Sequence, residues 1–225
     1  MNQSKLMYLS HVLDENTPTY GNRNKFVCEK KSDISKGDIA NDSSINSTVH
    51  IGTHVDMPYH FFEDGQTIED FDIDYFRFNN VLFIDMIPDD LIVKDDLITL
   101  LKKQANKDSY DILIVKTGIC HKRNSKDFWQ TNYGFDLSIA EYLRLNFPNI
   151  RVIGFDSISV SSFTNRMLGR EFHKAFLNPK QPILLLEDMD LTNLNKDSKI
   201  LKLEIAPLRI AKCDGLPCTI IAEVI

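Results

Sequence analysis

The chain has 225 residues, of which 43% are hydrophobic, and its formal net charge at pH 7 is −6. This length and composition suffice for one compact hydrophobic core, so we expect residues 1–225 to fold as a single α/β domain. An acidic chain without a basic stripe is not expected to bind nucleic acid. The N-terminus lacks the apolar core of a signal peptide, and no run of about eighteen apolar residues occurs, so we expect a cytoplasmic protein without membrane contact.

The pattern of apolar residues predicts mixed strands and helices without internal repeats. In chain order we expect a strand at 5–10, a long polar loop or arm near the site opening at 28–47, strands at 48–55 and 81–87, a helix at 94–104, a strand at 112–117, a helix at 137–147, a strand at 151–155, a helical stretch around His173, and strands at 183–187, 201–206 and 218–224. Asp136 is the expected N-cap of the second helix. The order strand, helix, strand between 112 and 155 is typical of a right-handed crossover, which predicts a mixed sheet with some parallel pairing.

Three of the six histidines and one aspartate lie close together in the run HIGTHVDMPYH, between residues 50 and 60. A first-row metal holds its ligands at roughly 2.0–2.2 Å, so any two of them lie within about 4 Å of each other. In a straight strand His50 and His54 would be roughly 13 Å apart. We therefore expect a kink at Gly52 that lets His50, His54 and Asp56 converge on a metal ion.

Three further residues are candidates for the same site, namely His60, His173 and Glu187. Pro58 cannot donate to a strand ladder, so it is expected to end the strand and to leave His60 on a loop above the site. Glu187 directly follows an apolar run at 183–186, where a carboxylate can enter a site at the edge of a sheet. Taken alone, Glu187 is more often an ordinary strand-terminal acid and His173 a residue of a helix surface.

The segment from His50 to His60 matches the HxGTHxDxPxH signature of the metal-dependent cyclase family, whose best-known members are the bacterial kynurenine formamidases, or arylformamidases. The later segments GFDSIS at 154–159, LLEDMDLTNL at 185–194 and PLRIAKCDGLP at 207–217 also resemble that family, in the same order. This resemblance implies a swivelling β/β/α fold. It also implies a homodimer, or a higher homo-oligomer, in which one subunit helps to wall the pocket of the other.

The resemblance further implies two metal ions per subunit. His50, His54 and Asp56 would hold one ion, and Asp56, His173 and Glu187 would hold the second, with Asp56 as the bridge. Histidine and carboxylate ligands suit Zn²⁺ first, with Mn²⁺ as a competitor where carboxylates bridge.

Such a centre would lower the pKa of water toward about 7 and polarise a carbonyl group. The expected reaction is hydrolysis of a small-molecule amide, with His60, which corresponds to the family's catalytic acid/base, relaying the proton to the departing nitrogen. The leading interpretation is an arylformamidase that converts N-formylkynurenine to kynurenine and formate. Two alternatives stay open: a relative that opens a cyclic amide or lactone, as an isatin hydrolase does, and a metal-binding protein without catalysis.

Tyr20 is the expected substrate-binding residue. Family members that act on N-formylkynurenine resemble one another in a Trp-Pro-Gly-Asp stretch near the N-terminus, whose tryptophan contacts the substrate. This chain reads TPTYGN at 17–22, which places a tyrosine at the corresponding point. Its ring can stack on an anilide, although a packed turn residue is an equal alternative.

Overall fold

The computed structural model describes residues 3–225, and its core is one nine-stranded mixed sheet. The strands follow the order β5-β12-β13-β4-β11-β10-β8-β6, and β1 also pairs with β13. The strands of this sheet are β1 (Lys5–Tyr8), β4 (His54–Asp56), β5 (Arg77–Phe78), β6 (Val81–Asp85), β8 (Ile112–Lys116), β10 (Val152–Phe155), β11 (Leu184–Glu187), β12 (Ile200–Pro207) and β13 (Gly215–Val224). The predicted mixed α/β fold is confirmed.

Four α-helices, two further strand pairs and several 3-10 helices complete the described chain. The α-helices are α1 (Asp95–Lys102), α2 (Asp127–Gln130), α3 (Leu137–Asn146) and α4 (Arg166–Phe176). The further pairs are β2 (Val27–Ser32) with β3 (Asp42–Asn46), and β7 (Ile92–Val93) with β9 (Gly134–Phe135). The 3-10 helices are η1 (Tyr20–Asn22), η2 (Ile34–Lys36), η3 (Pro58–His60), η4 (Ile68–Asp70), η5 (Ile73–Phe76), η6 (Lys107–Ser109), η7 (Ile119–Lys122) and η8 (Phe163–Asn165).

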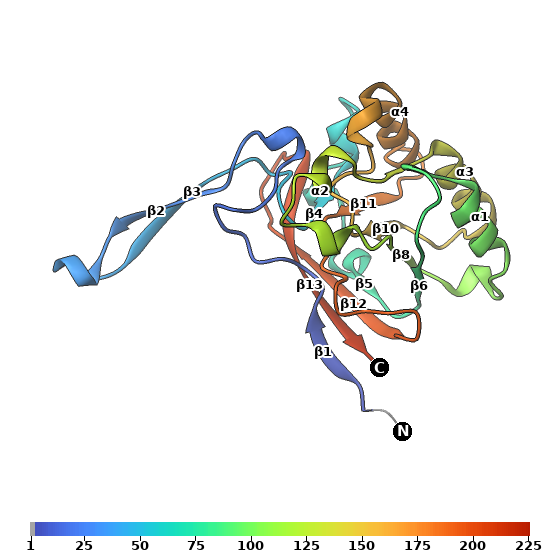
Figure 1. The fold of residues 1–225 in the computed structure, drawn as a ribbon, viewed down its shortest axis with the longest axis horizontal. Coiled ribbons are helices and arrows are strands. Elements are labelled where there is room, and N and C mark those ends of the chain that lie inside the picture. Colours follow the sequence, from blue (N-terminus) through green and yellow to red (C-terminus); the bar gives the residue numbers. More distant parts are fainter. Residues whose placement is uncertain (1–2) are drawn as a thin grey trace.

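One half of the sheet is parallel and lies against the helices. Strands β6, β8, β10 and β11 run parallel, and β8 and β10 are neighbours joined through α3, as the expected crossover requires. Every residue of β8, β10 and β11 is buried, which fits apolar runs covered on both faces. Helices α1, α3 and α4 lie together on one side of these strands (Figure 1). Asp136 caps α3, accepting a hydrogen bond from the backbone N–H of Ser138.

Strand β4 joins this parallel half to an antiparallel half. It pairs antiparallel with β11 on one side and with β13 on the other, and β12 and β1 continue the sheet beyond β13 (Figure 1). Because the three residues of β4 are fully paired and buried, they occupy the middle of the sheet. Two members of the predicted metal site, His54 and Asp56, therefore lie on a strand that is buried and paired on both sides.

The strand expected at 48–55 is wrong over most of its length. Only 54–56 is strand, and residues 49–53 form a series of bends. The cause is the expected kink: Gly52 adopts φ +55°, a conformation that L side chains rarely tolerate. Thr53 fixes the bend, because its hydroxyl accepts from the backbone N–H of His11 and donates to the carbonyl of Asp188.

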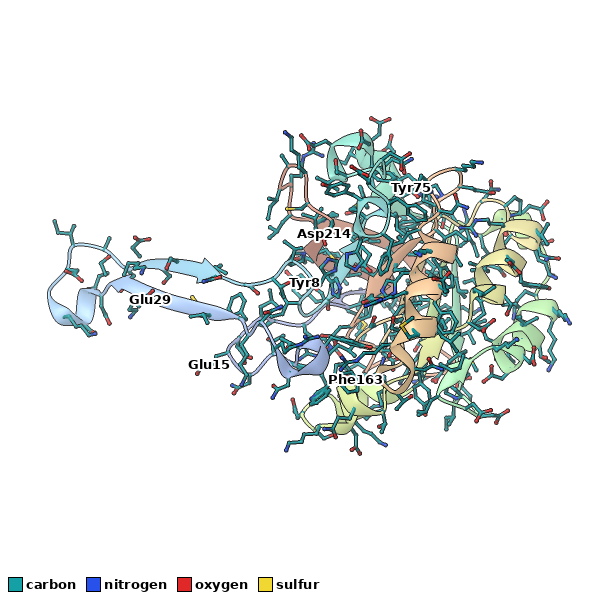
Figure 2. All side chains as sticks on the ribbon, turned by 90° about the horizontal axis from the view of Figure 1, so that it is seen from above. Tyr8, Glu15, Glu29, Tyr75, Phe163 and Asp214 are labelled. Carbon is teal, nitrogen blue, oxygen red and sulfur yellow. The ribbon has the colours of Figure 1, made fainter. Side chains whose placement is uncertain are left out.

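The loop expected at 28–47 is instead a β-hairpin. Strands β2 and β3 pair antiparallel, and the turn between them contains Asp33, which caps η2, and Gly37 at φ +97°. The hairpin, which we call the arm, projects far from the body of the molecule (Figure 1), and Glu29 lies on this projecting part (Figure 2). Its residues are almost all exposed, so no alternation of buried and exposed positions marked its strands in the sequence.

Among residues 3–225 no helix is long and apolar enough to cross a membrane.

Candidate metal centre

Three members of the site come together through strand register. His54 and Asp56 are two residues apart on β4, so their side chains leave the same face of the sheet. Glu187, at the end of β11, pairs directly with His54, which brings its carboxylate to that face. His54 Nε2 lies 3.4 Å from Asp56 Oδ1 and 3.4 Å from Glu187 Oε2. All three residues are at most 3% exposed.

His173 reaches the same cluster from helix α4. Its Nε2 lies 3.6 Å from Asp56 Oδ2 and 3.9 Å from Glu187 Oε1, and the residue is 6% exposed. It is therefore no helix-surface residue. We call His54, Asp56, His173 and Glu187 the floor of the site.

Backbone carbonyls fix the tautomers of both floor histidines. His54 donates from Nδ1 to the carbonyl of Gly52 at 2.8 Å, and His173 donates from Nδ1 to the carbonyl of Gly169 at 2.8 Å. A carbonyl can only accept, so Nδ1 carries the proton and Nε2 faces the carboxylates. Metal-binding histidines are commonly oriented in this way by an outer hydrogen bond.

The floor fits a divalent cation. Among the described residues, the buried atoms His54 Nε2 and Asp56 Oδ2 have no hydrogen-bond partner. Unpaired polar atoms in a protein interior are costly, and such orphans mark positions where an ion or water is expected. Nitrogen and oxygen donors at these separations are those that zinc and manganese accept.

The electrostatics of the floor favour positive charge. Burial lowers the pKa of His54, but Asp56 and Glu187 outweigh burial and raise that pKa well above its ordinary value. Burial also acts against ionisation of Asp56, yet His50 and His54 hold the pKa of this carboxyl well below its usual range. For His173 burial prevails and lowers the pKa, which keeps the imidazole in the neutral form that binds metals. A field that attracts a proton also attracts a metal ion, and the two compete for the same lone pairs.

His50 lies above the floor, on the bent segment that precedes β4. It donates from Nδ1 to Asp56 Oδ1 at 2.8 Å and from Nε2 to Asp214 Oδ2 at 2.7 Å. Burial lowers its pKa, but the charge of Asp56 and the hydrogen bond to Asp214 raise it to about 9. Gly215 makes room for the ring, because a Cβ there would lie 2.5 Å from His50 Cε1. His50, His54 and Asp56 offer ligand atoms that all lie within 4.8 Å of one another.

His60 stands at the opening, on the 3-10 helix that begins with Pro58. Its ring lies 4.1 Å from that of His50, between centroids, and its side chain is 26% exposed. It donates from Nδ1 to Asp214 Oδ2 at 3.0 Å, which leaves Nε2 free to exchange a proton. Pro58 thus ends the strand and places His60 at the site, as the sequence predicted.

Asp214 is the functional residue that sequence reasoning missed. A single oxygen, Oδ2, accepts from both His50 and His60, and these hydrogen bonds hold the pKa of Asp214 well below its usual range. The residue directly precedes β13, where Gly215 pairs with Asp56. Its signal was the aspartate in the run PLRIAKCDGLP, one of the segments that resemble the cyclase family.

A pocket with a volume of about 400 Å³ opens onto these residues. Tyr20 lines it, and the Tyr20 hydroxyl is buried without a hydrogen-bond partner among the described residues. Phe61 lines it as well and stacks on His173, with ring centroids 4.6 Å apart. The structure thus gathers all seven predicted site residues around one pocket, namely Tyr20, His50, His54, Asp56, His60, His173 and Glu187.

Comparison with known proteins assigns the family. The family model described as "Putative cyclase" matches residues 7–162, more than half of the chain. The chain is 26% identical to a kynurenine formamidase from Bacillus anthracis over 221 residues, which cover 96% of each protein. It is also 26% identical to cyclase-like protein 3 from Oryza sativa subsp. japonica, covering 95% of this chain and 77% of the rice protein.

Solved structures share the fold. Isatin hydrolase A from Labrenzia aggregata superposes with a TM-score of 0.80 at 20% identity, covering 98% of this chain and 93% of the other. A potential metal-dependent hydrolase with cyclase activity superposes with a TM-score of 0.76 at 20% identity, covering 98% of both chains. The family match, over more than half of the chain, shows that this protein belongs to the putative cyclase family.

Proposed function

We propose that this protein is a metal-dependent amide hydrolase, and that its substrate is an aryl formamide such as N-formylkynurenine. The observation that carries the proposal is the floor: two imidazole Nε2 atoms and two buried carboxylates converge beneath a pocket, next to the proton-exchanging His60. The relatives named kynurenine formamidase support the choice of substrate.

Two metal ions per chain are part of this proposal. His50, His54 and Asp56 would hold one ion, and Asp56, His173 and Glu187 the other. When bound, the metal would supply Lewis-acid polarisation of a carbonyl group and a water molecule of lowered pKa. Histidine and carboxylate donors favour Zn²⁺, with Mn²⁺ as the alternative to be tested.

The remaining chemistry belongs to residues of this chain. His60 takes up a proton at Nε2 and delivers it to the departing aniline nitrogen, while Asp214 holds the opposite ring nitrogen and so fixes the tautomer. Tyr20 presents its ring and its unpartnered hydroxyl to the substrate. Phe61 covers His173 and limits the access of bulk water to the floor.

The test is turnover of N-formylkynurenine by purified chain loaded with zinc or manganese. We expect release of kynurenine and formate, and His60→Ala should lower kcat by about 10²–10⁴-fold, the usual contribution of a general acid/base. His121→Ala is the matched control, because His121 is exposed and lies outside the pocket. Metal content of each variant is measured in parallel.

Three results would redirect the proposal. Faster turnover of a bicyclic lactam than of the formamide would retain the mechanism and change the substrate; the tyrosine found where formamidases carry tryptophan motivates this comparison. Equal rates for His60→Ala and the unaltered chain would remove His60 from the mechanism. Bound metal without turnover of any aryl amide or lactam would favour the binding protein.

We also propose that the chain acts as a homodimer and that the arm takes part in the contact. Apolar side chains on the arm are exposed within one chain: Val27 is 51%, Ile45 68% and Ile39 102% exposed. An isolated two-stranded hairpin is marginal in water, so a partner surface would stabilise it. Light scattering should give the mass of a dimer, and replacing 28–45 by a short Gly-Ser linker should give a monomer. A dimer that survives this deletion would contradict the role of the arm.

A further inference from the structure

Three arginines line the pocket above the floor: Arg23, Arg166 and Arg170. Within residues 3–225 none of them forms an ion pair or donates a side-chain hydrogen bond. By contrast, Arg77 and Arg123 pair with carboxylates, and Arg144 and Arg151 donate to backbone carbonyls. This concentration of positive charge contrasts with a chain whose net charge is −6. No ion pair within the described chain therefore neutralises these three guanidinium groups.

Among the described residues that line the pocket, no carboxylate outside the floor is available to neutralise the charge of these arginines. Of the described residues that line it, the only carboxylates are Asp56 and Glu187, which are 1% and 3% exposed and belong to the floor. Their charge is engaged with the floor histidines and, in the proposed function, with metal. The outer part of the pocket is consequently suited to an anionic group.

Helix α4 presents two of the arginines together with a floor residue. Arg166, Arg170 and His173 are separated by four and three positions, so they share one helix face. Arg166 begins the helix, where a cation interacts unfavourably with the helix dipole, and the first turn contains no acidic residue to offset it. Helix stability does not explain an arginine at this position.

Aromatic rings hold the Arg166 guanidinium in place. Its Cζ atom lies 4.0 Å from the ring centroid of Phe163 and 6.0 Å from that of Tyr20, and the two rings contact each other edge to face at 5.4 Å. A guanidinium that is stacked on a ring by its face keeps the N–H donors along its edge available. Phe163 lies on the side of the body from which the arm departs, as does Asp214 (Figure 2).

We propose, building on the proposed function, that Arg166 and Arg170 bind a carboxylate of the substrate. The substrates would then be aryl amides that carry a carboxylate, in preference to neutral bicyclic lactams. Guanidinium groups match a carboxylate with paired N–H donors, and such charge-assisted hydrogen bonds are about twice as strong as neutral ones. In this arrangement the amide lies at the floor, the aryl ring next to Tyr20, and the carboxylate at α4. A pocket of about 400 Å³ falls in the range of small-molecule sites.

The test compares N-formylkynurenine with its methyl ester, which keeps the amide and the ring but loses the negative charge. For metal-loaded wild-type chain, kcat/KM should be higher for the acid. In Arg166→Gln, Arg170→Gln and the double variant, the ratio of acid to ester should fall by about tenfold or more, mainly through KM for the acid. Arg170→Lys should retain part of the ratio, because it keeps the charge and loses the paired donors.

Lys174→Gln is the matched control. Lys174 is an exposed cation of α4 that pairs with Glu171 and does not line the pocket, so the ratio should stay within about twofold. Thermal melting of each variant verifies that it is folded.

Two outcomes separate this inference from the proposed function. Turnover of acid and ester with the same ratio in wild type and in both glutamine variants overturns the arginine assignment and leaves the hydrolase intact. Absence of turnover for both compounds overturns the proposed function. The assignment is then decided by calorimetry, in which N-formylkynurenine should bind the wild-type chain at least about tenfold more tightly than the double variant.

Discussion

The floor of the site and its mouth, which we define as His60 and Asp214, are built in different ways. The floor residues His54, Asp56 and Glu187 stand on paired strands and are nearly inaccessible to solvent. At the mouth, His60 comes from a 3-10 helix and Asp214 from a bend before β13, and their side chains are 26% and 41% exposed. In the proposed mechanism, strand register sets the positions of His54, Asp56 and Glu187, which would hold a cation, whereas segments outside the sheet position the groups that would exchange protons with substrate.

Removal of metal should have the greatest consequence, because every step of the proposed reaction depends on the ions that the floor and His50 would hold. Chelation followed by dialysis should abolish turnover, and zinc or manganese should restore it. A ligand present at 100 to 1,000 times its Kd stabilises a fold by about 3–4 kcal/mol, which corresponds to about 5–15 °C in Tm for a chain of this size. Calorimetry of the chelated and reloaded protein measures the shift. A Tm unaffected by chelation would contradict the assignment of the floor.

Asp56→Asn should disrupt metal binding at the floor without replacing a residue of the mouth. The substitution removes the charge that both proposed metal positions share, so metal should be lost on dialysis. Loss of an outer-shell partner typically costs 10–100-fold, so kcat/KM should fall by more than about 100-fold here. Elemental analysis and kinetics measure the two effects. Glu204→Gln, at an exposed residue of β12, serves as control. Full metal content in Asp56→Asn would place the cation elsewhere.

Asp214→Asn should reduce the rate and leave metal bound. The amide cannot accept from both His50 and His60 with the strength of a carboxylate, so the orientation of His60 becomes less defined. We expect kcat to fall by about 10–100-fold, as for other groups that orient a catalytic or metal-binding histidine. Asp72→Asn, an exposed position, is the control. Loss of metal in Asp214→Asn but not in the control would mean that the mouth also supports the floor.

Tyr20→Phe should have the smallest effect, and it distinguishes a substrate contact from a packing role. If the Tyr20 hydroxyl binds substrate, its removal should raise KM by about 2–10-fold, the value of one neutral hydrogen bond. If Tyr20 only packs, KM should stay constant and Tm should rise, because a buried hydroxyl without a partner has been removed. Steady-state kinetics and a melting curve decide between the two.

The convergence of His50, His54 and Asp56 could be predicted from sequence, because metal ligation would impose distances that the chain must satisfy. His50, His54 and Asp56 cannot converge from a straight strand, so the glycine between them had to provide the bend. The resemblance to a known family brought in His173 and Glu187, which local patterns alone could not connect.

The mouth and the arm were less accessible to such reasoning. Asp214 lies 154 residues beyond His60, and nothing in a turn sequence reveals which histidine it will face. Arg166 and Arg170 were not singled out from the sequence, because only the folded structure shows that they line the pocket. The arm lacks a buried face in a single chain, so its strands left no alternating pattern in the sequence.

The three-residue strand β4 has a consequence for how the site reports on folding. Successive side chains of a strand point to opposite faces of the sheet. A slip of one position against β11 or β13 would therefore turn Val55 to the face of the site and turn His54 and Asp56 to the opposite face. Such a slip would expose an apolar residue to the ligands and bury a histidine and an aspartate in the core. If the proposed cation binds, a chain that retains it would have aligned its central strand correctly, which would make bound metal a direct readout of native register.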